Sequence, residues 1–300
     1  MPPAAMPPAA SARLLFPRPD LSACVFMGVE RDTRGAALSD AQRFNYYPAT
    51  PMSLVSWIFE GTLHMVEECS GDGRPVLGPP LPRLVLSGPQ RRPVASWSPG
   101  PVHALSVAFY PDSLARLTGI GAESLVDRIL PLEEAVSGPL PAACRSLLAP
   151  DAASDPFDRL QALLQPLWSG PPPRETSLMS RMGVPLMGDW LRILAVRAAL
   201  SRAGRGVRQA QRRVKSWTGQ SQRDLQLFAR VEDVAVRVSR SRDDGPLDLA
   251  GLASDAGFAD QSHMGRAVRR MTGVAPGRLN ELMAGDEAFW FYRLLGERFG

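Results

Sequence analysis

Two stretches of the chain place long hydrogen-bond donors at helical spacing with few or no acids among them. In the first, seven Lys or Arg residues and no Asp or Glu lie between Arg202 and Arg223. In the second, one Gln and three Arg residues lie between Gln261 and Arg270. Gln pairs with adenine and Arg with guanine in the major groove, while Arg and Lys also contact phosphates. These residue types therefore predict contact with duplex DNA.

The second stretch has the parts of a helix-turn-helix unit. Gly257 suits the left-handed turn that ends a short first helix, and Phe258 can fill the space between two helices. Asp260 can cap the second helix by accepting its free first-turn amides. The apolar stripes of the two helices are Leu249, Leu252, Ala253 and Ala256, then Met264, Val268 and Met271. The open side of the second helix carries Gln261, Ser262, Gly265 and Arg266 as base-reading candidates and Arg269 and Arg270 as phosphate-binding candidates.

The first stretch repeats the second at an offset of 54 positions. The matched positions are Arg212 with Arg266, Val214 with Val268, Lys215 with Arg269, and Thr218-Gly219 with Thr272-Gly273. Arg208, Gln211 and Arg212 take the base-reading positions of this unit, and Arg213 and Lys215 suit phosphates. Gly206 stands where a Ser or Asp cap is expected, and the pattern leaves open whether this unit reads bases or only holds phosphates. Ordinary amphipathic helices with solvated basic faces are the alternative, but they do not account for the duplication.

The rest of the chain divides into a β-rich front and a helical back. Short apolar runs separated by Gly and Pro clusters predict strands of a small β-barrel or sandwich, at Ala23–Glu30, Met52–Val66, Arg83–Ser87 and His103–Phe109. Helical spacing appears at Asp112–Leu117, Ala122–Ile129 and Phe157–Trp168, and from Leu186 to about Leu295. We expect a disordered Pro/Ala-rich tail over residues 1–20 and a domain boundary near residue 180.

Charge follows the same division. Residues 1–180 hold 14 Lys and Arg against 17 Asp and Glu, whereas residues 181–300 hold 20 against 13. A basic back half favours a polyanionic partner. No apolar stretch reaches the roughly 18 residues of a transmembrane helix, and no signal peptide is recognisable, so we expect a cytoplasmic protein. Three widely spaced cysteines predict free thiols.

The segment LASDAGFADQSHMGRAVRRMTGVAPGRL (252–279) resembles the second helix-turn-helix of the AraC family of bacterial transcription regulators. The resemblance covers about residues 185–285. It implies a seven-helix domain over 181–300, a long connecting helix at about Gln222–Arg240, and recognition helices near 207–217 and 261–272 in successive major-groove turns. Met264 and Val268 depart from the Phe that is usual in the family, and Gly265 offers no side chain to a base.

The front half also resembles the cupin-like sensor domains that accompany this DNA-binding unit, at Phe44–Pro51, Ser56–Gly61 and Leu86–Gln90. This implies an α+β two-domain chain in which residues 21–180 form a small barrel with flanking helices that binds a small molecule, self-associates, or both. Candidates for a ligand pocket in the barrel are Trp57, Phe59, Trp97 and Phe109, with plain core packing as the alternative for most of them.

Enzyme chemistry is not expected. His64 and His103 lie far apart without the His-x-His pairing of a barrel metal site, and no Ser/His/Asp set or phosphate-binding loop stands out. We therefore predict no catalytic residues, metal or cofactor. The expected partners are double-stranded DNA, a small-molecule effector, RNA polymerase if the protein activates transcription, and a second copy of the chain, with no membrane. A metal-free cupin-like enzyme and a protein-interaction module with a degenerate helix-turn-helix pair are the alternatives.

Overall fold

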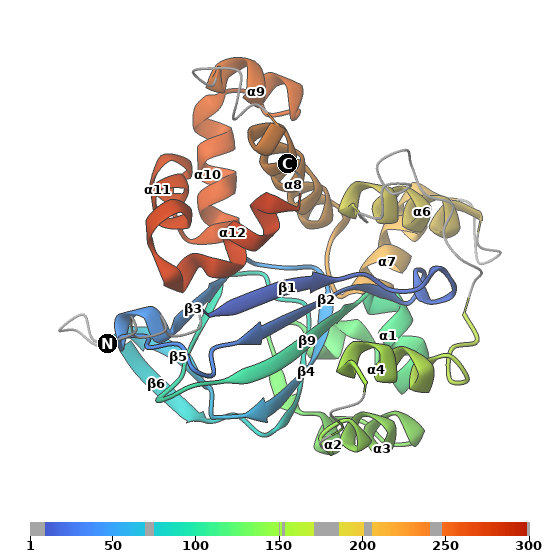
Figure 1. Ribbon diagram of the computed structural model, residues 1–300. Helices are drawn as coiled ribbons and strands as arrows, with labels where there is room; N and C mark the ends of the chain where they lie inside the picture. Colours follow the sequence, from blue (N-terminus) through green and yellow to red (C-terminus); the bar gives the residue numbers. More distant parts are fainter. Residues whose placement is uncertain are drawn as a thin grey trace, which may run out of the picture.

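The computed structural model describes residues 10–69, 75–149, 151, 154–170, 186–200, 206–240 and 248–298. A β-rich N-terminal domain lies at the centre of the molecule, and the C-terminal helices rise from one end of it (Figure 1). The first nine residues of the expected tail and the boundary expected near residue 180 lie outside the described residues.

Within the residues that the structure describes, ten strands form two antiparallel sheets. The six-stranded sheet has the order β1 (Ser11–Leu15), β2 (Val25–Asp32), β9 (His103–Phe109), β4 (Ser53–Glu60), β7 (Leu84–Ser87) and β10 (Ile129–Pro131). The four-stranded sheet has the order β3 (Phe44–Tyr47), β8 (Val94–Trp97), β5 (His64–Cys69) and β6 (Pro75–Pro80). In the described part of the chain, no ladder closes the two sheets into one barrel, and a single bridge pairs Thr50 with Gln90.

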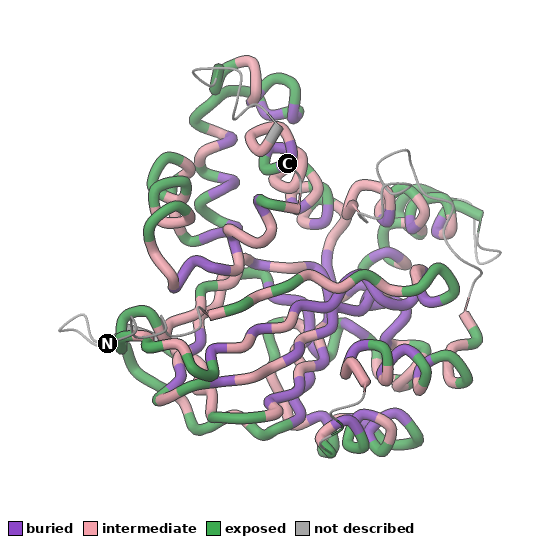
Figure 2. Tube along the Cα trace, viewed as in Figure 1, coloured by how far each residue is buried: buried purple, intermediate pink, exposed green. Residues whose placement is uncertain are grey.

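The two faces of the larger sheet are both covered, for different reasons. Side chains alternate along a strand, so Val55 and Trp57 of β4 point to one face and Leu54, Ser56 and Ile58 to the other. The first face packs against helices, and the Trp57 indole donates to the Cys144 carbonyl at 2.8 Å. The second face borders a cavity. Apolar residues therefore occupy both faces of β4, and Figure 2 shows long buried stretches along the strands of this sheet.

Short helices close the outer face of the larger sheet. They are α1 (Pro111–Thr118), η3 (Ala122–Leu125), α2 (Leu132–Ala135), α3 (Pro139–Ser146) and α4 (Pro156–Leu164), with the 3-10 turns η1 (Pro19–Leu21) and η2 (Ala41–Arg43) at other connections. Leu114, Leu132, Leu140 and Leu160 are buried together with strand residues of the sheet. Asp155 caps α4 by accepting the amides of Phe157 and Asp158.

Two expectations for this domain need correction. Residues 10–20 are not a tail, because Ser11–Leu15 pairs with β2 from Ser11 opposite Asp32 to Leu15 opposite Gly28. The Pro/Ala-rich composition around this short strand hides it. The helix expected over Ala122–Ile129 is only the 3-10 turn η3, since Asp127 adopts a left-handed φ of 56° and the chain then enters β10.

The C-terminal region holds seven α-helices in its described part, as the AraC-type resemblance implied. They are α6 (Met187–Leu200), α7 (Val207–Thr218), α8 (Gln222–Arg240), α9 (Leu249–Asp255), α10 (Gln261–Thr272), α11 (Pro276–Gly285) and α12 (Trp290–Glu297), with the 3-10 turn η4 (Glu287–Phe289) before the last. The long connecting helix and both recognition helices thus lie where they were predicted. In Figure 1, α12 lies between the other helices and the strands.

A substitution of Gly88 tests the packing at the end of β7. A Cβ at this position would lie 1.8 Å from the backbone oxygen of Leu125. Gly88→Ala should therefore lower the free energy of unfolding by about 1–3 kcal/mol or more, measured by urea unfolding of the full chain. Gly100→Ala is the matched control, because nothing lies within 4 Å of its added Cβ. Equal stabilities for the two variants would contradict this close packing.

Candidate DNA-binding face and interdomain cavity

The turn of the second helix-turn-helix unit has the geometry that the sequence predicted. Gly257 adopts a left-handed φ of 74°, and the Phe258 side chain after it is buried. The Asp260 carboxylate accepts the His263 amide at 2.6 Å and caps α10. Asp248 caps α9 in the same way through the amides of Ala250 and Gly251. These local interactions fix the angle at which α10 leaves the turn.

The α10 helix separates its apolar and polar residues. Met264, Val268 and Met271 are buried against α8 and α9, as predicted. On the open side, Gln261, Ser262, Arg266, Arg269 and Arg270 are exposed and Gly265 is half-buried. Arg270 also pairs with Asp224 in the first turn of α8, at 3.1 Å. The base-reading candidates of this unit are therefore brought together on one accessible surface.

The α7 helix has the same division, with differences in its basic residues. Val214 and Thr218 are buried, whereas Arg208, Gln211, Arg212 and Lys215 are exposed. Arg213 is half-buried and donates to the Ala198 carbonyl of α6 at 2.6 Å. Gly206 precedes α7 without a side-chain cap. Arg213 thus contributes to the joint between α6 and α7, a contact that the sequence did not predict.

The two duplicated units share the same hydrogen bonds where their recognition helices end. Thr218 Oγ1 donates to the Val214 carbonyl at 2.7 Å, and Thr272 Oγ1 donates to the Val268 carbonyl at 2.9 Å. Each hydroxyl also accepts the amide two residues ahead at 3.2 Å. The following glycines, Gly219 and Gly273, adopt left-handed φ values of 72° and 79°.

The end of α7 and the neighbouring α6 are docked on the N-terminal domain. A Cβ on Gly219 would lie 2.5 Å from Val126 Cγ2, so the chains are in close contact there. Arg197 of α6 pairs with the buried carboxylate of Asp112 at 2.5 Å, and its guanidinium lies 5.2 Å from the Trp217 ring centre. Lys215, a phosphate candidate, lies 3.6 Å from Glu123, and both side chains are exposed.

The second helix-turn-helix unit and the helix α12 contact the N-terminal domain through a separate set of residues. The Ala49 amide donates to the Met271 carbonyl at 2.7 Å, and a Cβ on Gly273 would lie 3.3 Å from Pro93. The Trp290 indole donates to Asn45 Oδ1 at 2.8 Å, which holds α12 on β3. Further contacts are the ion pair of Arg31 with Glu287 at 2.5 Å and the stacked rings of Tyr46 and Phe289.

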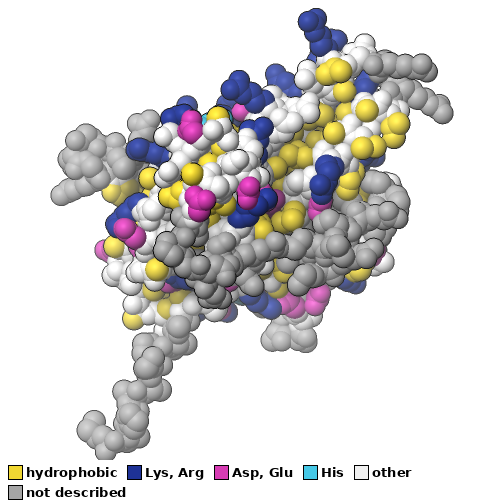
Figure 3. Space-filling view, turned by 90° about the horizontal axis from the view of Figure 1, so that it is seen from above, with side chains coloured by type: hydrophobic (Ala, Val, Ile, Leu, Met, Phe, Trp, Pro, Cys, Tyr) yellow, Lys and Arg dark blue, Asp and Glu magenta, His cyan; other side chains and the backbone are white. Residues whose placement is uncertain are grey.

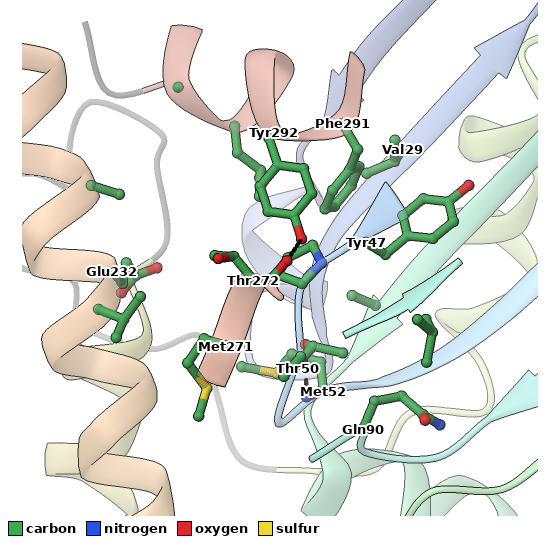
Figure 4. A pocket seen from close by; sticks show the side chains of 18 of the residues that line it. Val29, Tyr47, Thr50, Met52, Gln90, Glu232, Met271, Thr272, Phe291 and Tyr292 are labelled. Atoms are coloured by element: carbon green, nitrogen blue, oxygen red, sulfur yellow. Dashed lines mark hydrogen bonds between the residues drawn. The ribbon is translucent and has the colours of Figure 1, made fainter. Parts of the chain in front are cut away.

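A cavity of about 600 Å³ extends from between the sheets to the helices above them. Figure 4 shows Tyr47, Thr50 and Gln90 from the N-terminal domain on one side and Glu232 of α8 on the other. The sheet side of its lining includes Val29, Leu54, Ser56, Ile58, Ser106 and Ala108, and the helix side includes Phe228, Met264, Met271, Trp290, Tyr292 and Arg298. The lining is mainly apolar, and it is formed by both domains.

The four aromatic pocket candidates do not lie among the described residues that line this cavity. Trp57 and Phe109 are buried in the core on the other face of the sheet. Phe59 packs at the edge of that core, 5.0 Å from the His103 ring centre. Trp97 donates to the Asp40 carbonyl at 3.2 Å, near the start of β3. This corrects the pocket assignment: the interior is lined by the other residues of each alternating pair.

Glu232 is a cavity residue that the sequence analysis missed. Burial raises the pKa of its carboxyl to about 7, against the lowering effects of Arg298 and of the Met187 and Gly188 amides. The Glu232 side chain is half-buried, because it lines the wall of the cavity. A signal was present: Leu225, Phe228 and Glu232 follow the apolar spacing of α8, and an acid in such a stripe marks a special position.

The remaining polar candidates have structural partners. His103 Nε2 lies 2.8 Å from Glu30 Oε1, and His64 Nδ1 lies 2.9 Å from the Gly78 carbonyl. Cys24 and Cys144 are both buried. Within the described ranges, no three His, Cys, Asp or Glu residues are grouped as metal ligands, and no helix has both the length and the apolar character to span a membrane.

Comparison with known proteins finds a family match for one part of the chain. Residues 191–281 match the model of a helix-turn-helix domain, of AraC type. Curated proteins give no match. Among solved structures, an apo variant of ToxT from Vibrio cholerae is 11% identical and has a TM-score of 0.36, with 90% of this chain and 96% of that chain covered. Unsaturated fatty acid bound ToxT from the same organism is 12% identical, with a TM-score of 0.35 and coverages of 90% and 93%.

Glu232 makes stability depend on pH. Its pKa is raised from 4.5 to about 7, so the folded state holds the proton more tightly than the unfolded state. The stability of the native chain should then fall as pH rises from about 4.5 to about 7 and stay constant above. Glu232→Gln should raise the free energy of unfolding by up to about 3 kcal/mol above pH 7 and change it little near pH 4. A difference that stays the same at both pH values would contradict this assignment.

Proposed function

We propose that α7 and α10 read two successive major-groove turns of an asymmetric promoter site, because residues 191–281 match an AraC-type helix-turn-helix domain, as found in DNA-binding transcription regulators. The two recognition helices then contact half-elements about 34 Å apart along the duplex. The protein acts in the cytoplasm, and RNA polymerase is a further partner if its effect is activation.

One observation supports this proposal above the others: both duplicated units present donors on the face opposite their buried stripe. Arg208, Gln211 and Arg212 are exposed on α7, and Gln261, Ser262 and Arg266 are exposed on α10. Gly265 among them leaves space for a close approach of the backbone to DNA. Figure 3 shows Lys and Arg side chains over the helical end of the molecule, with apolar side chains gathered between them. Neutralised phosphates make such binding strongly dependent on salt.

The basic residues beside the base-reading positions suit phosphate contacts. Arg269 is exposed at the end of α10, and Arg270 meets Asp224 beside it. On α7, a phosphate can replace Glu123 as the partner of Lys215, because both members of that pair are exposed. Arg213 has a second role in this proposal, since it also joins α7 to α6 through the Ala198 carbonyl.

The second part of the proposal is control by an apolar small molecule in the interdomain cavity. The cavity of about 600 Å³ is within the size range of small-molecule sites. Its wall includes Val29 and Ala108 of the sheet and Met264 and Met271 of the recognition helix α10. An occupant in contact with both domains stabilises one arrangement of the two helix-turn-helix units over others.

Arg266→Ala tests base reading by α10. The variant should bind the cognate site more weakly by about 1–3 kcal/mol and discriminate less at the base that Arg266 contacts. The measurement is a fluorescence anisotropy titration of the full chain against the cognate site and against single-base variants.

Arg145→Ala is the matched control, because Arg145 is an exposed arginine of the N-terminal domain paired with Glu133. It should bind all of these duplexes as the native chain does. If Arg266→Ala lowered the affinity for every duplex equally, Arg266 would contact phosphates and not a base.

A further inference from the structure

Glu232 lies on the side of α8 that lines the interdomain cavity. It belongs to α8, the helix that joins the two helix-turn-helix units, and its side chain points into the cavity opposite Tyr292 and Thr272 (Figure 4). The surrounding helix residues that line the cavity, Phe228, Val231 and Ala235, are apolar. A carboxyl group in such a wall is the polar feature that an apolar occupant meets on this side.

The same carboxylate holds the start of α6. Glu232 Oε2 accepts the Met187 amide at 2.7 Å, in the first turn of the helix. Anions are favourable at helix N-termini because the first amides have no partner within the helix. The 14-residue α6 is the first helix of the first helix-turn-helix unit, and Trp190 and Leu194 bury its inner face. The strength of this bond therefore bears on how firmly the first unit is joined to α8.

The charge of Glu232 is finely balanced. Burial and Asp189 of α6 favour the neutral carboxyl, whereas Arg298 at the end of α12 favours the ionised one, and the resulting pKa is about 7. Met27 and Phe26 of β2 contact the Arg298 guanidinium from the sheet side of the cavity. Near neutral pH both forms of Glu232 are populated, so one added hydrogen bond shifts the balance.

We propose that Glu232 is the polar contact of the cavity occupant, that the occupant is an apolar molecule with a hydrogen-bond donor such as an alcohol, phenol or amine, and that its binding fastens the first turn of α6 to α8. A donor on the carboxylate stabilises the ionised form. An ionised carboxylate accepts the Met187 amide more strongly than a neutral one does. This inference rests on the ligand cavity proposed above.

Two isomeric probes test the inference on the full chain without DNA. The first, 1-hexanol, has a donor, and the second, 1-methoxypentane, has the same formula and no donor. Methyl carbon-13 labelling of methionine reports occupancy independently of Glu232, because Met52, Met264 and Met271 line the cavity. Hydrogen exchange of the first-turn amides of α6 reports the hydrogen bond from the Met187 amide to Glu232.

Both probes should shift the methionine signals, but only 1-hexanol should slow the exchange of the Met187 amide, by about two- to fivefold. In Glu232→Leu the Met187 amide should exchange faster than in the native chain, and neither probe should slow that exchange. Asp233→Asn is the matched control: Asp233 neighbours Glu232 on α8 and pairs with Arg237. It should respond as the native chain does.

The outcomes separate the two proposals. If neither probe moves the methionine signals, the cavity does not take apolar molecules, and this inference falls with it. If both probes shift the signals and slow exchange equally, or if 1-hexanol still slows the exchange of the Met187 amide in Glu232→Leu, Glu232 is not the contact and only this inference is overturned. Because no DNA takes part, the reading of bases by α7 and α10 stands or falls separately.

Discussion

Each recognition helix ends in a Thr-Gly pair, and the left-handed glycine turns the chain directly against the N-terminal domain. Gly219 lies against Val126, and Gly273 lies against Pro93. Side chains larger than hydrogen are disfavoured by the left-handed backbone conformation at both positions and by the close contact at the first. Because the two units are held at equivalent points, the N-terminal domain sets the separation and orientation of the surfaces that we propose to meet DNA.

The cavity follows from this arrangement. The helices stand on the rim of the sheets through contacts such as Trp290 with Asn45 and Ala49 with Met271, and the space between the sheets opens toward them. Its wall is continuous from β2 and β4 to α8 and α10. In the proposed mechanism, a molecule inside contacts the elements that position both recognition helices, and its occupancy is coupled to DNA geometry through packing. In the proposed complex, the apolar interior supplies the binding energy and Glu232 supplies a polar contact.

The helix-turn-helix units were predictable from sequence because their determinants are local. Gly257, Phe258 and Asp260 specify the turn within four residues, and the duplication locates the first unit. The ligand cavity was not predictable in the same way. Both faces of β4 carry apolar residues, so the sequence around Trp57 does not reveal which face borders the helices and which borders the cavity. β1 was missed because it is short, and its pairing with β2 is a long-range property.

Genome-wide mapping of bound sites in the native host tests the central claim most directly, with the native chain, Arg212→Ala and Arg266→Ala compared. Two recognition helices held at a fixed separation predict a motif of two half-elements about one helical turn apart. Arg212→Ala should lose sequence preference in one half-element and Arg266→Ala in the other. A single half-element that both variants weaken together, or diffuse binding by all three proteins, would contradict the account.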